Sequence, residues 1–206
     1  MSCFNYIVRF YELKDYTLTV EGLQNGQYRY KCSTSGIQSN FSFFKATINH
    51  TQKIFEFEIQ HNLAVQSSFD KEIFTMPDIT IIKAGKVKTT KDYYDSNKTF
   101  SFVNNTDLIS FCEVKNYTPF PELIFNFIGV VNELKKNIIS RKLKPISLSH
   151  IAPSLMISGK PNKQTLKIKA SLEKRYCINI IYDLFYSGAE TFSRNNLSKF
   201  RILGAI

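Results

Sequence analysis

The stretch Asp107–Lys115, with the sequence DLISFCEVK, decides how the rest of the chain is interpreted. Its apolar run predicts a β-strand that ends in a carboxylate, Glu113, and an ammonium group, Lys115. Side chains two residues apart on a strand point to the same face, about 6 to 7 Å apart along the strand. We therefore expect Glu113 and Lys115 to lie side by side, with Val114 turned to the opposite face.

The composition is that of a globular protein. With 206 residues, 43% of them hydrophobic, the chain is long enough for one large domain with a buried core. No apolar run approaches the roughly 18 residues that span a bilayer, and the N-terminus lacks a basic region followed by an apolar one. The cysteines, at positions 3, 32, 112 and 177, lack the spacing of a zinc site. We expect a cytoplasmic protein with free thiols.

The charge favours a polyanionic partner. Lysine and arginine number 27 against 17 acidic residues, for a net charge of +10. Without a basic amphipathic terminus or a lipidation signal, nucleic acid is a better candidate than a membrane. Residues 83–100 combine lysines with tyrosines and could follow a phosphate backbone, or form a solvated hairpin. Lys163, Lys167 and Lys174 share one face of an expected helix, most often a solvated arrangement.

The N-terminal half indicates strands. Residues 1–52 carry short aromatic runs separated by glycines, which predict a β-rich extension, although Phe41–Ile48 could also be a short helix. Strict alternation over Phe55–Val65 predicts a strand with one wet face. Glu56 and Glu58 would lie on that wet face, either solvated or binding a metal. His61 shares the apolar face and is expected to be a hydrogen-bonded structural residue.

The second half alternates strands and helices. After the strand expected over residues 72–83 and the one ending at Lys115, Thr118 is a candidate N-cap for an amphipathic helix. A strand around Leu155–Ile157, a helix from Asn162 to about Tyr176 and a buried strand over Cys177–Tyr186 follow. The expected fold is α/β, a mixed sheet flanked by helices over residues 53–206, with the extension before it. The apolar face of the first helix would consist of Leu123, Phe127, Val131, Leu134 and Ile138.

The chain lacks the sequence motifs of several common kinds of active site. The chain has no glycine-rich phosphate loop before a helix, no zinc-type spacing and no G-x-S-x-G elbow. What remains is Pro77-Asp78, where Asp78 begins the apolar run Ile79–Ile82 of one expected strand, and, 35 residues after Asp78, the triplet Glu113-Val114-Lys115 at the end of another. Taken alone, Asp78 is better explained as a turn-capping residue, and Glu113–Lys115 as an ion pair that contributes about 0 to 1 kcal/mol.

Together with the helix that follows, these motifs resemble the PD-(D/E)xK nuclease superfamily, over roughly residues 53–186. The resemblance implies a restriction-endonuclease-like fold and a Mg²⁺-dependent endodeoxyribonuclease that hydrolyses phosphodiester bonds. Restriction, phage defence, mobile elements and DNA repair are the contexts in which such enzymes occur.

The resemblance also implies roles for particular residues. Asp78 and Glu113 would bind Mg²⁺, for which Mn²⁺ could substitute, and the backbone carbonyl of Val114 would be a further ligand. Lys115 would orient or deprotonate the attacking water. Many members add a glutamate from a preceding helix. Glu58 is the tentative counterpart, although it is expected on a strand, and Asp107 ranks below Asp78 as a ligand.

A second function class stays open. A noncatalytic nucleic-acid-binding or complex-assembly protein on the same fold would show salt-sensitive binding without metal dependence. For either class, DNA is favoured over RNA as the partner. An enzyme that cuts both strands would most simply act as a homodimer, or with an activating protein partner.

Overall fold

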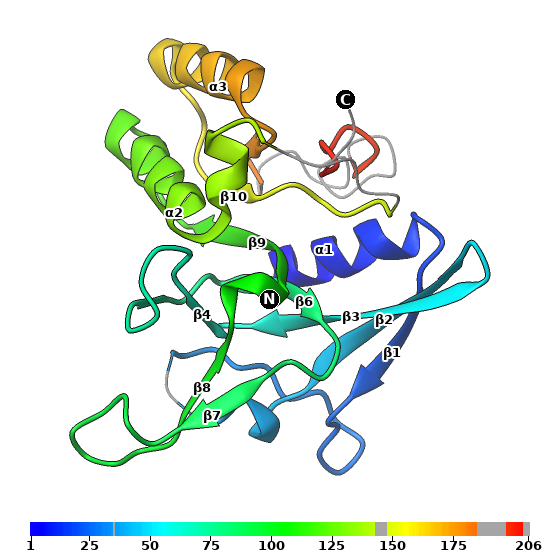
Figure 1. Ribbon diagram of the computed structural model, residues 1–206. Helices are drawn as coiled ribbons and strands as arrows, with labels where there is room; N and C mark the ends of the chain where they lie inside the picture. Colours follow the sequence, from blue (N-terminus) through cyan, green and yellow to red (C-terminus); the bar gives the residue numbers. More distant parts are fainter. Residues whose placement is uncertain (35, 143–147, 185–196, 204–206) are drawn as a thin grey trace. The chain divides into compact units, whose positions relative to one another are not determined.

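The computed structural model describes residues 1–34, 36–142, 148–184 and 197–203. It has the expected α/β class: the strands pair in both antiparallel and parallel fashion, and helices flank them (Figure 1). The chain divides into two compact units, Met1–Phe111 and Cys112–Ile206. The division falls inside strand β9 (Leu108–Lys115), the strand with which the sequence analysis began.

The first unit contains an antiparallel arrangement of four strands. In order of pairing they are β1 (Thr17–Glu21), β2 (Phe43–His50), β3 (Lys53–His61) and β6 (Ile79–Lys83). Strand β2 settles the open alternative for Phe41–Ile48 in favour of a strand. Thr51 and Gln52 connect β2 to β3 in a two-residue turn, with positive φ angles of 50° and 63°. Two positive φ angles are typical of a type I′ turn, the hairpin turn whose twist matches that of the flanking strands.

The first unit begins with helix α1 (Ser2–Glu12), where the sequence analysis expected strands, so that prediction was wrong. Figure 1 shows α1 beside strands β2 and β3. The buried positions recur every three or four residues, which is the spacing of one helix face. The aromatic content favoured strands locally, but burial of this face decides the conformation. The buried residues are Cys3, Phe4, Tyr6, Ile7, Phe10 and Tyr11.

The expected wet face of β3 is wet only at its beginning. Glu56 is exposed and pairs with Lys45 of β2. Glu58 and Gln60, on the same face, are buried at 7% and 2% exposure. The cover includes the 3-10 helix η1 (Gln38–Asn40), because the side chain of Gln38 donates to Gln60. Alternation therefore identified the strand as far as His61, but the expected span to Val65 was too long, because the chain turns at Asn62 with a φ of 42° and Val65 belongs to a separate strand, Ala64–Gln66. A distant segment determined which face of β3 is solvated.

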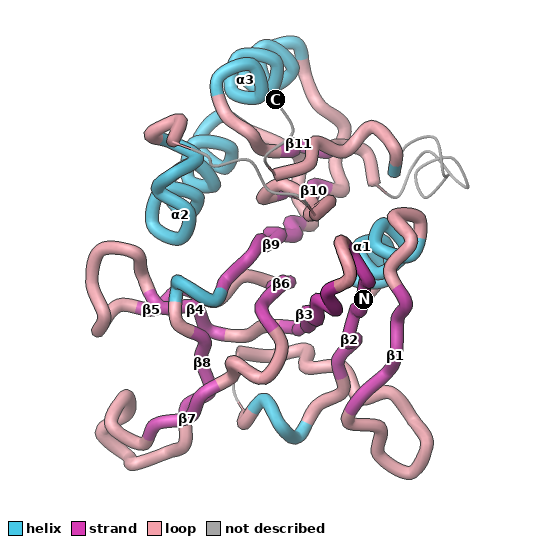
Figure 2. The backbone as a smooth tube through the Cα atoms, turned by 45° about the vertical axis from the view of Figure 1, so that its right-hand side comes forward, coloured by secondary structure: helices cyan, strands magenta, loops and turns pink. Residues whose placement is uncertain are grey.

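Four short strands form a second sheet in the first unit. Their order is β5 (Phe74–Thr75), β4 (Ala64–Gln66), β8 (Phe100–Val103) and β7 (Lys88–Thr90). Strands β7 and β8 pair antiparallel (Figure 2). Residues 83–100 therefore contain the first strand of a hairpin, the connecting loop and the first residue of the second strand. The tyrosines of this segment are partly occupied by the hairpin itself: Tyr93 stacks on Phe100 with the ring centroids 4.0 Å apart.

The second unit is built on parallel strands. Strand β10 (Ser154–Ile157) pairs with both β9 and β11 (Asn179–Ile181). Strand β11 is shorter than the expected span of 177–186, of which residues 185 and 186 lie outside the described residues. Parallel pairing requires long connections, which two helices provide.

These two helices agree closely with the sequence pattern. Helix α2 (Pro121–Ile139) buries Ile124, Phe127, Val131, Leu134 and Ile138, so one member of the expected face, Leu123, is replaced by its neighbour. Its N-cap is Phe120 rather than the expected Thr118. Helix α3 (Lys163–Arg175) begins with a capping box between Asn162 and Thr165, as the sequence predicts. Within the described residues, neither these helices nor α1 combine the length and apolarity needed to cross a membrane.

Candidate active site

Glu113 and Lys115 lie side by side near the end of β9, as their spacing predicts. The Lys115 Nζ donates to the Glu113 Oε2 over 2.7 Å. The side chain of Glu113 is 14% exposed and that of Lys115 is 32% exposed. The pair is therefore partly desolvated yet accessible from solvent, which strengthens its electrostatic effect on a nearby charged group.

The carboxyl end of β9 is held in place by the next strand. In the register of β9 and β10, Leu155 lies opposite Glu113 and Ile157 opposite Lys115. The Ser158 N–H donates to the Lys115 carbonyl over 3.0 Å. A Cβ at Gly159 would collide with the backbone that follows Lys115, so the two loops approach as closely as glycine allows. In parallel sheets, ligands bind at this carboxyl edge.

Val114 turns away from Glu113 and Lys115, as strand parity predicts, and lies opposite Met156 of β10. Its side chain is therefore not part of the candidate site. The resemblance assigns only its backbone carbonyl, and that role stays a prediction.

Asp78 lies immediately before β6, as expected, and belongs to the first unit. Its carbonyl accepts a hydrogen bond from the Asn62 N–H over 3.1 Å, which anchors the start of β6 to the end of β3. The pKa of the Cys3 thiol is raised to about 11, mainly by burial, against the lowering effect of the N-terminal amino group and with a smaller contribution from the charge of Asp78. Asp78 therefore lies near the start of α1. Its convergence with Glu113 stays a prediction.

Glu58 lies at the opposite end of β6 from Asp78. In the register it faces Ile82, four residues after Asp78, which corresponds to about 13 Å along the strand. Both carboxylate oxygens accept hydrogen bonds: Oε1 from the Gly85 N–H over 2.7 Å, and Oε2 from Gln60 over 2.8 Å. The carboxylate therefore points toward the end of β6. These bonds give Glu58 a structural role, and its role as a metal ligand stays a prediction.

Glu58 is the acceptor end of a buried chain of hydrogen bonds. At the donor end, Lys31 Nζ donates to Gln38 Oε1 over 3.0 Å, and Gln38 Nε2 donates to Gln60 Oε1 over 2.9 Å. Gln60 in turn donates to Glu58. Both amides thus point from the ammonium group toward the carboxylate, so that each hydrogen bond polarises the next. Burial lowers the pKa of Lys31 to about 8.

The other carboxylates considered have partners elsewhere in the first unit. Helix α1 does precede the strands, but its one carboxylate, Glu12, occupies its last position and pairs with Arg9. Asp107 lies in the 3-10 helix η2 (Asn105–Asp107), not in β9, and accepts from Lys83 Nζ over 3.1 Å. Neither is positioned as the additional glutamate that many members of the resembled superfamily carry.

His61 is a buried residue on the apolar face, as expected, but its Nε2 atom does not make the expected hydrogen bond. Its ring stacks on Phe4 with the centroids 3.4 Å apart. Within the described residues, its Nε2 has no hydrogen-bond partner. Burial, together with the N-terminal amino group, lowers the pKa of His61 to about 3, so the ring is neutral.

One carboxylate was missed by the sequence analysis. Asp183 follows β11 with a positive φ of 61°, and its N–H donates to the Gly159 carbonyl over 3.1 Å. It therefore lies at the carboxyl edge of the same parallel strands as Glu113. The sequence interpretation placed it inside an apolar strand, so no signal marked it.

Within the described ranges of the chain, no group of three histidine, cysteine, aspartate or glutamate side chains is arranged to hold a metal ion. Comparisons with protein-family models, curated proteins and solved structures find no match to this chain. The candidate site therefore rests on the Glu113–Lys115 pair and on the order of the elements around it.

Proposed function

We propose that this protein is a Mg²⁺-dependent endodeoxyribonuclease of the PD-(D/E)xK type. The observation that supports this most is the Glu113–Lys115 pair, joined over 2.7 Å at the carboxyl end of a strand. An acidic group and an ammonium group at that edge are the residues from which a hydrolytic site for phosphodiesters is built.

The order of elements supports the proposal as well. Asp78 immediately precedes β6, the acid-x-lysine triplet ends β9, and the buried helix α2 follows. Strand β10 then returns parallel to β9. This is the sequence of a Pro-Asp strand, an acid-x-lysine strand, a helix and a strand that the resemblance implies.

The proposed ligands fit magnesium by their chemistry. The carboxylates of Asp78 and Glu113 and the carbonyl of Val114 are hard oxygen donors, and Mg²⁺ takes few protein ligands while keeping several waters. When bound, Mg²⁺ would polarise the scissile phosphate and lower the pKa of a water molecule. Lys115 would orient the attacking water and offset the negative charge that develops on the phosphate. Glu113 would hold the Lys115 ammonium group in position through their hydrogen bond.

The test is cleavage of supercoiled plasmid with Mg²⁺ and with EDTA. We expect Mg²⁺-dependent cleavage, which Glu113→Gln, Lys115→Ala and Asp78→Asn each slow by about 10²- to 10⁴-fold. Lys45 and Glu56 form a matched control, because they are joined over the same 2.7 Å but lie on strands β2 and β3. Lys45→Ala and Glu56→Gln should cleave at the wild-type rate.

A second measurement addresses the convergence of Asp78 and Glu113. Mn²⁺ binding is followed by electron paramagnetic resonance in Asp78→Asn, in Glu113→Gln and in the double variant. If the two carboxylates hold one ion, the loss of affinity in the double variant is much smaller than the sum of the single losses. Additive losses, or no loss, would contradict a shared ion.

The noncatalytic alternative predicts a different pattern. DNA would bind with strong salt dependence, equally well with Mg²⁺ and with EDTA, and remain uncleaved. Equal cleavage by the wild type and by folded Glu113→Gln would also overturn the proposal, because the activity would then arise elsewhere.

A further inference from the structure

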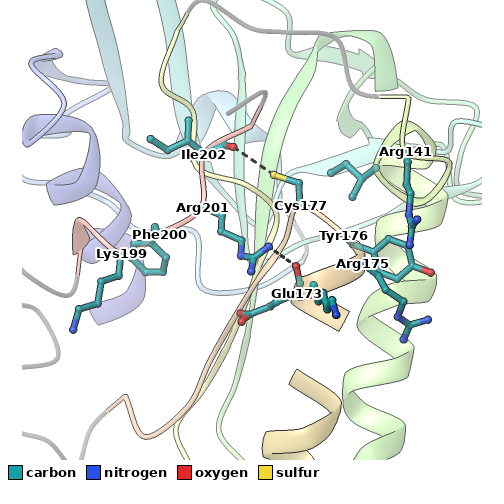
Figure 3. A pocket seen from close by; sticks show the side chains of 11 residues that line it. Arg141, Glu173, Arg175, Tyr176, Cys177, Lys199, Phe200, Arg201 and Ile202 are labelled. Atoms are coloured by element: carbon teal, nitrogen blue, oxygen red, sulfur yellow. Dashed lines mark hydrogen bonds between the residues drawn. The ribbon is translucent and has the colours of Figure 1, made fainter. Parts of the chain in front are cut away.

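A basic pocket lies in the second unit, at the end of α3 and beside the segment 199–202. It has a volume of about 640 Å³, within the range of pockets that hold small ligands. Five cationic side chains line it, from three separate segments of the chain (Figure 3). These residues, here called the basic pocket, are Arg141, Lys174, Arg175, Lys199 and Arg201.

The charge of the basic pocket is not neutralised by its one acidic residue. Glu173 also lines it, but its carboxylate pairs with Lys169, over 3.2 Å, and accepts from the Ile180 N–H, over 2.8 Å. Arg201 donates to the Glu173 backbone carbonyl, as Figure 3 shows. Arg175 donates to the Ser171 carbonyl over 3.3 Å. Such bonds to neutral carbonyls orient a guanidinium group without removing its charge.

The wall that carries Arg201 is fixed by a buried side chain. Asn179 Oδ1 accepts from the Arg201 N–H over 2.8 Å, and Asn179 Nδ2 donates to the Arg201 carbonyl over 3.3 Å. Asn179 is 4% exposed. The Cys177 thiol donates to the Ile202 carbonyl over 3.4 Å, next to the same wall. The guanidinium of Arg201 is therefore presented by a rigid backbone rather than by a free loop.

The opposite wall holds Arg141 in an unfavourable backbone conformation. Arg141 follows the C-cap of α2 with a φ of 54°, and the Lys142 N–H donates to the Asn137 carbonyl over 2.9 Å. This is the helix ending in which glycine is preferred, because a Cβ is strained at that angle. An arginine at this place keeps a cation beside Arg175 and Tyr176 (Figure 3).

We propose that the basic pocket binds phosphate groups of a nucleic-acid strand. Five cations on three segments exceed what one phosphate needs, but match successive phosphates of a backbone. The half-buried Tyr176 also lines the pocket, and aromatic rings are surfaces on which bases stack. The inference rests on the proposed function for its ligand class, and it assigns the strand a contact distinct from Glu113 and Lys115.

The test is fluorescence anisotropy of a labelled 20-base-pair duplex and of its single strand, in EDTA so that no cleavage occurs. Arg141→Gln combined with Arg201→Gln should weaken binding by about 10- to 100-fold and reduce the slope of log affinity against log salt by about 2. The charge-matched control is Lys53→Gln with Lys71→Gln, two exposed lysines of the first unit. It should change affinity by less than about twofold. An equal loss in both double variants would overturn the inference, because net charge alone would then explain binding.

Arg141→Gly separates binding from folding. Glycine suits the positive φ of position 141, so this variant should melt at the same or a higher temperature and still bind DNA more weakly. Unchanged DNA affinity in Arg141→Gly and in the double variant would contradict the proposal. Calorimetric titration with pyrophosphate tests whether the pocket binds a small phosphate compound instead of a nucleic-acid strand. Pocket-dependent binding of pyrophosphate without pocket-dependent binding of DNA would overturn the nucleic-acid assignment.

The two proposals fail in different ways. If neither the wild type nor any variant cleaves DNA, while Glu113→Gln binds DNA as tightly as the wild type and the pocket variants bind it more weakly, the proposed function fails and the pocket inference stands. If the wild type cleaves DNA and the pocket variants require no higher DNA concentration for half-maximal cleavage, the pocket inference fails and the proposed function stands.

Discussion

Glu58 in the first unit and Glu113 in the second are both glutamates on strands, and both have a polar side chain two residues further along. Their surroundings differ. Glu58 is 7% exposed and accepts from a backbone N–H and from the amide of Gln60. Glu113 is paired with the ammonium group of Lys115, whose side chain is 32% exposed. One carboxylate is part of a closed hydrogen-bond network, and the other forms an ion pair that a ligand can reach.

The comparison shows why strand parity alone does not identify a reactive carboxylate. Parity placed both glutamates on their faces, but a metal at Glu58 would compete with two donors that already hold its oxygens, the Gly85 N–H and the buried Gln60 amide. The occupancy of the carboxylate oxygens, not the pattern, separates a structural glutamate from a candidate ligand.

The largest expected effect is on stability. Glu58→Ala should lower the free energy of unfolding by about 3 kcal/mol, because it leaves the Gly85 N–H and the Gln60 amide unpaired and creates a cavity. Glu113→Ala should change it by less than about 1 kcal/mol. Urea denaturation at pH 7, followed by circular dichroism, measures both. Glu56→Ala, exposed on the same strand as Glu58, is the control. If Glu113→Ala were as damaging as Glu58→Ala, the Glu113–Lys115 pair would be structural.

The second effect compares the buried histidines of the two units. Burial lowers the pKa of His61 to about 3, with the N-terminal amino group adding to it, and lowers the pKa of His150 to about 4, with Lys135 adding to it. In the unfolded chain each histidine titrates near 6.5. Below that pH the unfolded state binds protons that the folded state does not, so stability falls as the pH falls.

Each histidine should therefore remove about 2 kcal/mol of stability at pH 5 relative to pH 8. His61→Phe keeps a ring against Phe4 and should lose its share of this acid sensitivity, as should His150→Phe. Urea denaturation at pH 8, 6.5 and 5 measures the difference from the wild type. An unchanged pH dependence in both variants would show that other groups cause the acid sensitivity.

A smaller effect, in the same direction but at higher pH, concerns Lys31. Burial lowers its pKa to about 8, well below the value of 10.5 for an unperturbed lysine. Between these values the unfolded chain holds a proton that the folded chain lacks, so stability rises with pH. The gain should be about 1 kcal/mol from pH 8 to pH 9. Lys31→Met should lack this gain.

Above pH 9 the Cys3 thiol changes stability in the opposite sense, because its pKa is raised to about 11. The comparison with the variant is therefore made below pH 9, and a gain that persists in Lys31→Met would exclude Lys31 as its source.

The smallest effect compares two strained backbone positions. Gln52 in the β2–β3 turn has a φ of 63°, and Arg141 after α2 has a φ of 54°. Replacement of either by glycine should raise the free energy of unfolding by at most about 1 kcal/mol. Thermal unfolding measures this gain. Only Arg141→Gly should also lose DNA affinity. If Gln52→Gly lost as much affinity, the loss would not report on the basic pocket.

The sequence predicted elements where periodicity is strong and local. The capping residues of α3, the buried face of α2 apart from one residue and most of strand β3 followed from spacing. The strand expected over residues 72–83 is divided into β5 and β6, and Asp78 lies immediately before β6. Helix α1 was missed because its aromatic residues favour strands when considered singly. The burial of Glu58 could not be predicted, because the segment that covers it lies about twenty residues earlier in the chain.

What the sequence determined by itself is the local geometry of the pair: two residues apart on a strand, Glu113 and Lys115 share one face whatever surrounds them. It also determined the excess of cations, but not where they gather. Only the tertiary structure brought Arg141, Arg175 and Arg201 to one pocket, from segments up to 60 residues apart. Only the tertiary structure enclosed Glu58. Side-chain direction on a strand is a local property of the backbone, whereas burial and charge clustering depend on which distant segments pack together.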